Sequence, residues 1–239
     1  MGQSMRAIDD NLQAVRGRIA RAAAAAGRDP GSVTLLAVTK SQPAALVREA
    51  LAAGQRAFGE NYVQEALEKM DSLPGTARAP STTDIEWHLI GPLQSNKTRL
   101  VAQRFDWVHT VESEKIARRL SDQRPGGMAA LNVLIQVNVS GEASKSGVDP
   151  QAVLSFARAT STLPHLKLRG LMAIPEPGAG NARYRELKSL YDKLKSEFRF
   201  DVLSVGMSGD METAIGEGST LVRIGTAIFG ARQKAASTA

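Results

Sequence analysis

The stretch LLAVTK at residues 35–40 decides the fold, because an apolar run of β-forming residues ends in a lysine just past the expected strand. Two further short runs, LSVGMSGD at residues 203–210 and LVRIGT at residues 221–226, pass into small hydroxyl and glycine residues. Turns of that composition suit a phosphate group. An amine after the first strand and phosphate-type turns after the last two would together hold a small aldehyde that carries a phosphate.

Between these runs the chain alternates between short β-rich runs and helical stretches, which is the pattern of parallel strands joined by crossover helices. We expect strands at residues 33–38, 56–59, 85–90, 107–110, 131–137, 166–172, 202–205 and 221–224. Strand and helix pairs repeated in this way predict an α/β fold, a single (β/α)8 barrel of the TIM type. The alternative, an open doubly wound sheet, predicts a glycine-rich phosphate turn after the first strand, where this chain has Lys40.

The expected helices follow from apolar spacing and from capping residues. A helix at residues 4–26 places four apolar side chains on one face, namely Ile8, Leu12, Val15 and Ile19. Proline at residue 43 and the pair Asp149-Pro150 open two more helices, and an apolar stripe predicts another at residues 181–198. Residues 73–83 and 175–180 are expected loops. We expect residues 1–239 to form one domain, with residues 1–28 as an N-terminal helix packed on the barrel.

The composition is that of an ordinary globular protein, with 43% hydrophobic and 23% charged residues over 239 positions. There is no cysteine, which excludes disulfides, thiolate nucleophiles and cysteine-based zinc sites. The N-terminal region has no apolar core of the signal-peptide type, and no segment approaches the roughly 20 apolar residues of a spanning helix. We therefore expect a cytoplasmic protein with no membrane partner.

The formal net charge of +6 raises the question of nucleic-acid binding, because excess lysine and arginine attract polyanions. The basic residues, however, are scattered among acidic ones, and only 5% of residues are aromatic, which leaves few stacking platforms. We expect no nucleic-acid partner.

Lys40 is the first candidate for chemistry. Its amine forms a Schiff base with an aldehyde if burial favours the neutral, nucleophilic form, and pyridoxal phosphate is the obvious aldehyde phosphate. The alternative is a solvated charge that merely follows a strand.

Ser208 and Gly209 follow the seventh expected strand, and Gly225 and Thr226 follow the eighth. Barrels commonly bind phosphate with the loops at these two places, and a short helical turn at residues 226–229 would turn backbone amides toward an anion. The alternative for Ser208 is that it caps a helix that begins near Asp210.

Arg223 lies inside an apolar strand, so its guanidinium needs an acceptor. A cofactor ring nitrogen would serve, and an arginine there would keep a pyridine nitrogen unprotonated and weaken the ring as an electron sink. The alternative is an internal ion pair with Glu60 or Glu217.

Other polar residues stand at or near strand ends: Asn61, Tyr62, Trp87, His88 and His109. They are candidates for the same pocket, although isolated histidines are more often hydrogen-bonded core residues. Because the histidines are not accompanied by clustered carboxylates, we expect no metal site. The loop at residues 141–147 lacks the Walker spacing, which argues against nucleotide hydrolysis and leaves a rim loop or a surface turn.

Taken together, several motifs closely resemble the pyridoxal-phosphate homeostasis protein family over nearly the whole chain. They are LAVTK at residues 36–40, FGENYVQE at 58–65, WHLIGPLQSNK at 87–97, the segment 141–147, LRGLM at 168–172 and the segment 207–232. The resemblance implies a barrel similar to the amino-terminal domain of bacterial alanine racemase.

The resemblance also implies the residue roles. Pyridoxal 5'-phosphate would be linked to Lys40 as a Schiff base, Ser208, Gly225 and Thr226 would contact its phosphate, and Arg223 would face its pyridine nitrogen. Asn61, His88 and Met207 match positions around the cofactor pocket. Thr39 and Ser41, beside the lysine, are conservative departures from the family pattern.

The family resemblance implies a non-catalytic protein that holds pyridoxal phosphate and influences free cofactor, amino-acid and keto-acid pools. Residue 239 follows closely on the eighth strand, so we expect no second, β-rich domain to supply the second base of a racemase. We expect a monomer whose partners are the cofactor and the apoenzymes that use it. The alternative is a pyridoxal-phosphate-dependent racemase or lyase that uses Lys40 as its base.

Overall fold

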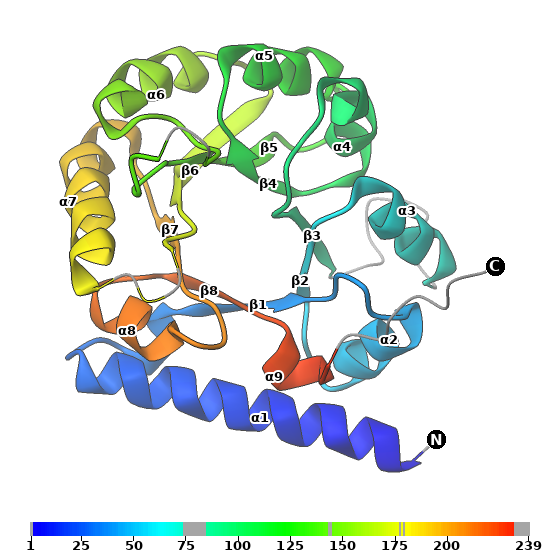
Figure 1. The fold of residues 1–239 in the computed structure, drawn as a ribbon. Coiled ribbons are helices and arrows are strands. Elements are labelled where there is room, and N and C mark those ends of the chain that lie inside the picture. The colour runs from blue at the N-terminus through cyan, green and yellow to red at the C-terminus, as the bar shows by residue number, and fades with distance from the viewer. Residues whose placement is uncertain (1, 74–84, 143–144, 177, 179, 232–239) are drawn as a thin grey trace.

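The computed structural model describes residues 2–73, 85–142, 145–176, 178 and 180–231. Eight parallel strands close into a barrel in sequence order, from β1 next to β2 round to β8 next to β1 (Figure 1). The strands are β1 (Thr34–Val38), β2 (Ala57–Glu60), β3 (Glu86–Leu89), β4 (Trp107–Val111), β5 (Leu131–Gln136), β6 (Leu166–Met172), β7 (Val202–Ser204) and β8 (Leu221–Ile224). The predicted (β/α)8 barrel is confirmed, and the alternative open sheet is wrong.

Helices surround the barrel (Figure 1). They are α1 (Gly2–Ala25), α2 (Ala44–Ala52), α3 (Val63–Ser72), α4 (Thr98–Arg104), α5 (Glu114–Gln123), α6 (Val153–Ser161), α7 (Asn181–Phe198), α8 (Met211–Gly216) and α9 (Thr226–Phe229), with 3-10 turns at Pro30–Ser32, Ser95–Lys97 and Pro150–Ala152. The bounds of α7 agree with the expected ones. Asp149 caps the turn before α6, as its sequence predicts, by accepting a hydrogen bond from Gln151 N. The loop expected at residues 73–83 lies outside the described residues from residue 74 onward.

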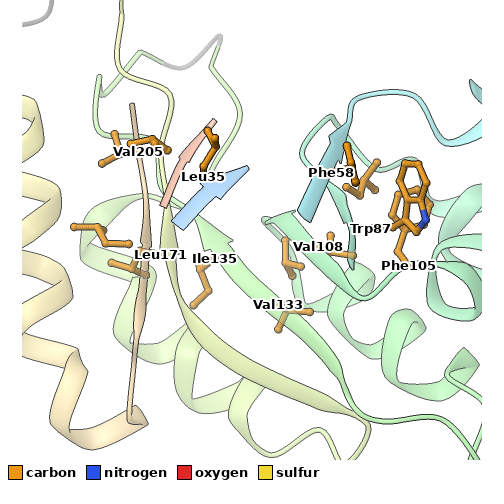
Figure 2. Packing of buried hydrophobic residues seen from close by; sticks show 14 of the residues in the cluster. Leu35, Phe58, Trp87, Phe105, Val108, Val133, Ile135, Leu171 and Val205 are labelled. Carbon is orange, nitrogen blue, oxygen red and sulfur yellow. The ribbon is translucent and has the colours of Figure 1, made fainter. Parts of the chain in front are cut away.

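Each strand alternates its side chains between the barrel interior and the surrounding helices, which is the period of a strand. In β1, Leu35 and Ala37 belong to the large outer core beneath the helices, whereas Leu36 and Val38 belong to a small separate cluster in the interior. A second interior cluster consists of Trp107, Leu134 and Met172. Figure 2 shows part of the outer core, including Phe58, Trp87 and Phe105 gathered beside β2 and β3.

Helix α1 lies across one side of the barrel, against α2, α8 and α9 (Figure 1). The four apolar side chains expected on one face are all buried there, with Leu12 fully so. Asn11 Nδ2 also donates to the Ile228 carbonyl in α9 over 2.9 Å. The segment after α1 is tied down by Arg28, whose guanidinium donates to the carbonyls of Ile215 and Ser219. The N-terminal helix is therefore part of the barrel's packing.

No helix in the described ranges combines the length and the apolar character that a bilayer crossing requires.

We expect Leu12→Ala to destabilise the protein by about 2–5 kcal/mol, because it removes a fully buried side chain between α1 and the barrel. The matched control is Leu154→Ala on α6, where the side chain is 36% exposed and the loss is expected to stay below about 1 kcal/mol. Urea denaturation followed by circular dichroism measures both.

The same experiment tests the one-domain prediction. A single transition in each protein is expected of one domain, and two separate transitions, with only one sensitive to Leu12, would contradict the one-domain prediction.

Candidate functional site

A cavity of about 270 Å³ opens at the carboxyl ends of the strands, slightly below the usual range of about 300–1,000 Å³ for ligand pockets. Seven of the eight residues to which the family resemblance assigns a role at the cofactor line it: Lys40, Asn61, Met207, Ser208, Arg223, Gly225 and Thr226. The exception is His88, which lies in the barrel interior. The cavity therefore brings residues from β1, β2, β7 and β8 to one place.

The backbone on both sides of Lys40 is held by a cluster centred on a second lysine. Lys69 Nζ, on α3, donates to the Thr39 carbonyl over 2.5 Å and to Glu60 Oε1 over 2.6 Å. It also donates to Glu65 Oε1 over 2.7 Å, and the same Glu65 oxygen accepts the Ser41 amide over 2.6 Å. Residues on either side of Lys40 are thus anchored to one buried ammonium group.

Ser41 adopts a left-handed backbone conformation, with φ of 58°. A non-glycine residue in that region costs about 1–3 kcal/mol and persists only where surrounding contacts impose it. Here the Glu65 carboxylate imposes it through the Ser41 amide. The strained turn directs the chain away from the strand immediately after Lys40.

Glu60 shares this cluster and is fully buried. Its Oε1 accepts from Lys69 and from the Thr39 hydroxyl, the latter over 2.6 Å. Burial raises the pKa of Glu60 above its ordinary value, and the Lys69 charge opposes that rise. Sequence reasoning missed Lys69, although its place on the apolar face of α3, between Ala66 and Met70, was a usable signal.

The turn after β7 is shaped by Gly206, whose φ of +103° suits glycine. A Cβ there would meet the Ala214 Cβ at 2.6 Å. Asp210 then holds the turn, because its Oδ1 accepts the Met207 amide over 2.5 Å. Asp210 precedes α8 as its N-cap residue, so the alternative that Ser208 caps this helix is wrong. Ser208 lines the cavity instead.

The turn after β8 runs close to β1. A Cβ on Gly225 would lie 3.1 Å from the Val38 carbonyl oxygen, which is tighter than most contacts of real side chains. Thr226 begins α9, so the short helical turn expected at residues 226–229 is confirmed. The Thr226 hydroxyl and the Ser208 hydroxyl therefore belong to residues that line one cavity from two neighbouring turns.

Arg223 is buried on β8, and its acceptors are neutral. Nη1 donates to the Ser204 carbonyl over 2.8 Å and to Ser204 Oγ over 2.9 Å, and Nη2 donates to the Ala173 carbonyl over 3.0 Å. A guanidinium has five N–H donors, so these bonds leave donor capacity on its cavity side. Burial lowers the pKa of Arg223 to about 10.

The expected alternative partners of Arg223 are engaged elsewhere. Glu60 pairs with Lys69, and Glu217 pairs with Arg185 over 3.0 Å. The alternative of an internal ion pair between Arg223 and either glutamate is therefore wrong. A charged group held by carbonyls and a hydroxyl costs more to bury than a paired one, which marks Arg223 as a functional candidate.

Asn61 follows β2 and lines the cavity, and its Oδ1 is buried with no hydrogen-bond partner among the described residues. Tyr62 is 59% exposed and Trp87 packs in the outer core, with its ring centroid 5.9 Å from that of Phe58. Trp87 thus points away from the cavity, which corrects the expectation that it lines the pocket.

His88 and His109 are buried side by side, with His88 Nδ1 at 2.9 Å from His109 Nε2. They are hydrogen-bonded core residues of the barrel interior, which agrees with the alternative given for isolated histidines at strand ends. Among the described residues, His, Asp and Glu side chains do not gather in threes as metal ligands would.

A second cavity adjoins the first and shares Asn61, Ile90 and Ile174 with it. Lys145, from the loop expected at the rim, lines this second cavity, while residues 143–144 of that loop lie outside the described residues. Lys145 Nζ contacts Ser140 Oγ over 3.1 Å and Glu142 Oε1 over 2.9 Å.

Comparison with known proteins places the chain. The family described as alanine racemase, N-terminal domain, matches residues 10–233. The pyridoxal phosphate homeostasis protein of Pseudomonas aeruginosa is 56% identical over 232 residues, which cover 95% of this chain and 97% of that protein. The protein of the same name from Escherichia coli K12 is 52% identical over 233 residues, covering 95% and 98%.

Solved structures agree. PipY of Synechococcus elongatus, solved with PLP bound, is 35% identical, with a TM-score of 0.77 and coverage of 93% of this chain and 100% of that one. A protein of Bifidobacterium adolescentis described as unknown is 37% identical, with a TM-score of 0.87 and coverage of 96% and 97%.

Alanine racemase of Clostridium difficile shares 10% identity with a TM-score of 0.72, over 96% of this chain and 58% of that one, and so shows the fold alone. The resemblance in the sequence motifs is confirmed by the relatives at half or more identity over nearly the full chain. This chain belongs to the family of pyridoxal phosphate homeostasis proteins, built on the barrel that alanine racemase uses as its N-terminal domain.

Proposed function

We propose that this protein binds pyridoxal phosphate through Lys40 and takes part in the intracellular homeostasis of that cofactor and of amino and keto acids. The observation that carries the proposal is the cavity that gathers the Lys40 amine, the buried Arg223 guanidinium and the hydroxyl residues Ser208 and Thr226. The names of the relatives, and PipY with its bound PLP, support the same assignment.

The residues present fit this group. The unpartnered Asn61 Oδ1 is a buried acceptor at the cavity, and Arg223 has donor capacity left for a ring nitrogen. The turns after β7 and β8 stand where barrels commonly bind phosphate. Pyridoxal phosphate, when bound, supplies an aldehyde that condenses with a primary amine and releases one water.

Each residue then has a defined task. Lys40 Nζ provides the amine, and the Lys69 cluster holds the backbone on both sides of it. Ser208 and Thr226 provide hydroxyl donors for the phosphate, and Gly225 lets the chain approach β1 closely enough to complete the turn. Arg223 would donate to the ring nitrogen, and because a guanidinium has no acceptor for an N–H group, it would keep that nitrogen unprotonated.

We propose that the protein performs no catalytic turnover. An unprotonated ring nitrogen is a poor electron sink for amino-acid chemistry. Among the described residues that line the cavity, only Lys40 and Arg223 are titratable, and racemisation needs a base on each face of the substrate carbon. The competing reading, a racemase or lyase, would have to use Lys40 for every proton transfer.

The roles assigned to Met207 and His88 are also part of the proposal. Met207 is 40% exposed at the cavity and would cover one side of the cofactor. His88 lies in the barrel interior below the residues that line the cavity, and it would influence the bound cofactor from there. We further propose that residues 1–239 form a single domain, and that the protein is a monomer that hands the cofactor to apoenzymes. We propose a cytoplasmic location, because a chain without cysteine suits a reducing compartment.

Lys40→Ala is expected to abolish the absorbance band that wild-type protein gains on mixing with pyridoxal phosphate, because the variant lacks the condensing amine. Lys97→Ala serves as the matched control and is expected to gain the band like wild type. Borohydride reduction followed by peptide mass spectrometry locates the modified lysine. A wild-type protein that stays colourless, or label confined to Lys97 or Lys145, contradicts the assignment.

The double change Ser208→Ala with Thr226→Ala is expected to weaken binding of pyridoxal phosphate by at least about tenfold, since it removes two hydroxyl donors to a dianion. Equilibrium titration of the absorbance band measures the effect. The control is Ser161→Ala with Thr162→Ala, whose exposed hydroxyls bond only to nearby helix carbonyls. Equal affinities in the two double variants would remove the phosphate role.

Incubation of the purified, cofactor-loaded protein with a panel of L- and D-amino acids is expected to give no product and no change of chirality. Chiral chromatography of the mixtures makes the measurement. Turnover that disappears in Lys40→Ala would overturn the non-catalytic reading and favour a racemase or lyase.

A further inference from the structure

A chain of hydrogen bonds leads from the cavity into the barrel interior. Arg223 Nη1 donates to Ser204 Oγ over 2.9 Å, and Ser204 Oγ lies 3.1 Å from His109 Nδ1. His109 Nε2 lies 2.9 Å from His88 Nδ1, and His88 Nε2 lies 3.6 Å from Glu86 Oε2. Every member except Glu86 is buried.

The two ends of the chain lie toward opposite openings of the barrel. Arg223 lines the cavity at the carboxyl ends of the strands. Glu86 is the first residue of β3, at the amino end, and its side chain is 57% exposed. The connecting residues come from β7, β4 and β3, so the chain crosses the interior that apolar branched side chains fill in most barrels.

The direction of the protons in this chain follows from its two ends, because the Arg223 guanidinium only donates and the Glu86 carboxylate only accepts. A guanidinium only donates, so Ser204 Oγ is an acceptor from Arg223 and has its single proton left to donate to His109 Nδ1. A neutral His88 whose Nε2 faces the Glu86 carboxylate carries its proton on that nitrogen, so its Nδ1 accepts from His109 Nε2. His109 Nδ1 is then left as the acceptor for the Ser204 hydroxyl.

The charges around the two rings support neutral imidazoles. Burial lowers the pKa of both His88 and His109, and the Arg223 charge lowers that of His109 further. The groups that face them are Glu86 and Asp106 on the acidic side and Arg223 on the basic side. The neighbouring His88 ring lowers the pKa of Glu86 below its ordinary value.

An aromatic wall holds the His88 ring in place. Trp107 stacks on it with ring centroids 5.1 Å apart and an angle of 6° between the planes. Arg169 lies over the same Trp107 ring at 4.7 Å, and its charge also acts on Glu86. Arg169 itself is paired with Asp201. The ring of His88 is therefore oriented by packing as well as by its hydrogen bonds.

The hydrogen-bond chain also connects Arg223 to a negatively charged group, because none of the direct hydrogen-bond acceptors of its guanidinium is charged. The Asp210 charge acts on Arg223, but the two oxygens of Asp210 accept from the Met207 amide and the Tyr184 hydroxyl. A series of aligned hydrogen bonds polarises each member in turn, so a carboxylate at the far end strengthens the acceptor at the near end.

We propose that Ser204, His109 and His88 form a one-directional hydrogen-bond chain from Arg223 to His88, and that the 3.6 Å contact of His88 Nε2 with the Glu86 carboxylate couples this chain to the opposite barrel opening. Through it, the charge at the amino-terminal opening tunes the donor that Arg223 presents to a ligand in the cavity. His88 is then a positioning residue rather than a cofactor contact. The effect of Glu86 on ligand binding rests on the proposed binding of pyridoxal phosphate. The hydrogen-bond chain itself is a property of the protein without ligand.

Ring-nitrogen NMR of the ¹⁵N-histidine-labelled, cofactor-free protein tests the chain. The sequence has 3 histidines, and exposed His165 serves as the internal reference. We expect His88 and His109 to carry their protons on Nε2, with Ser204→Ala shifting the His109 Nδ1 signal and Glu86→Gln shifting the His88 Nε2 signal. A proton on Nδ1 of either ring, or signals indifferent to both changes, overturns the chain.

Titration with pyridoxal phosphate tests the tuning. Glu86→Gln is expected to weaken binding by about two- to tenfold and to shift the absorbance band of the bound cofactor. The control is Glu114→Gln on α5, a side chain of similar exposure at 55% that pairs with Arg118 outside the barrel. It is expected to match wild type.

The two arms separate the possible failures. Glu86→Gln indistinguishable from Glu114→Gln in affinity and spectrum overturns the tuning while cofactor binding stands. Wild-type protein that binds no pyridoxal phosphate overturns the proposed function and the tuning together, and the NMR result is then read on the chain alone.

Discussion

The hydrogen bonds between β1 and β8 are the interaction on which the rest of the site depends. This pairing closes the barrel and sets Leu36 opposite Arg223 and Ala37 opposite Ile224. It thereby places Lys40, just past β1, beside the turn that carries Gly225 and Thr226. A slip of one residue would turn Arg223 from the interior to the outer core and bring an apolar side chain into its place, because strand side chains alternate with a period of two.

The Lys69 cluster gives this arrangement its precision at Lys40. A buried ammonium that contacts Thr39, Glu60 and Glu65 is costly to desolvate, and an apolar replacement of similar volume is often no less stable in other proteins. Its value lies in orientation: it holds the carbonyl before Lys40 and, through Glu65, the left-handed turn after it. Stability alone does not account for such a cluster beside Lys40.

The barrel interior shows the same preference for polar groups where apolar ones would pack. Two small apolar clusters fill part of it, and His88, His109 and Ser204 cross the remainder. Ser204, His109 and His88 Nδ1 each have a hydrogen-bond partner among these residues, which reduces the desolvation penalty of burying them, while His88 Nε2 faces Glu86 at 3.6 Å without a hydrogen bond. The arrangement fixes the Arg223 side chain from behind while leaving its donor capacity on the cavity side.

By itself, the sequence determined the elements and most of the cavity. The β-rich runs, the Asp149 cap and the apolar faces of α1 and α7 are local patterns, and local patterns are readable from neighbouring residues. The motif set then indicated the family and, with it, Lys40, Ser208, Arg223 and Thr226.

Only the tertiary structure decided what these residues contact. Arg223 bonds to Ser204 and Ala173 rather than to a glutamate, Trp87 faces outward, and Lys69 reaches Thr39 from another element. The physical reason is that such contacts join residues far apart in the chain, and barrel closure and strand register, which no local pattern encodes, bring them together.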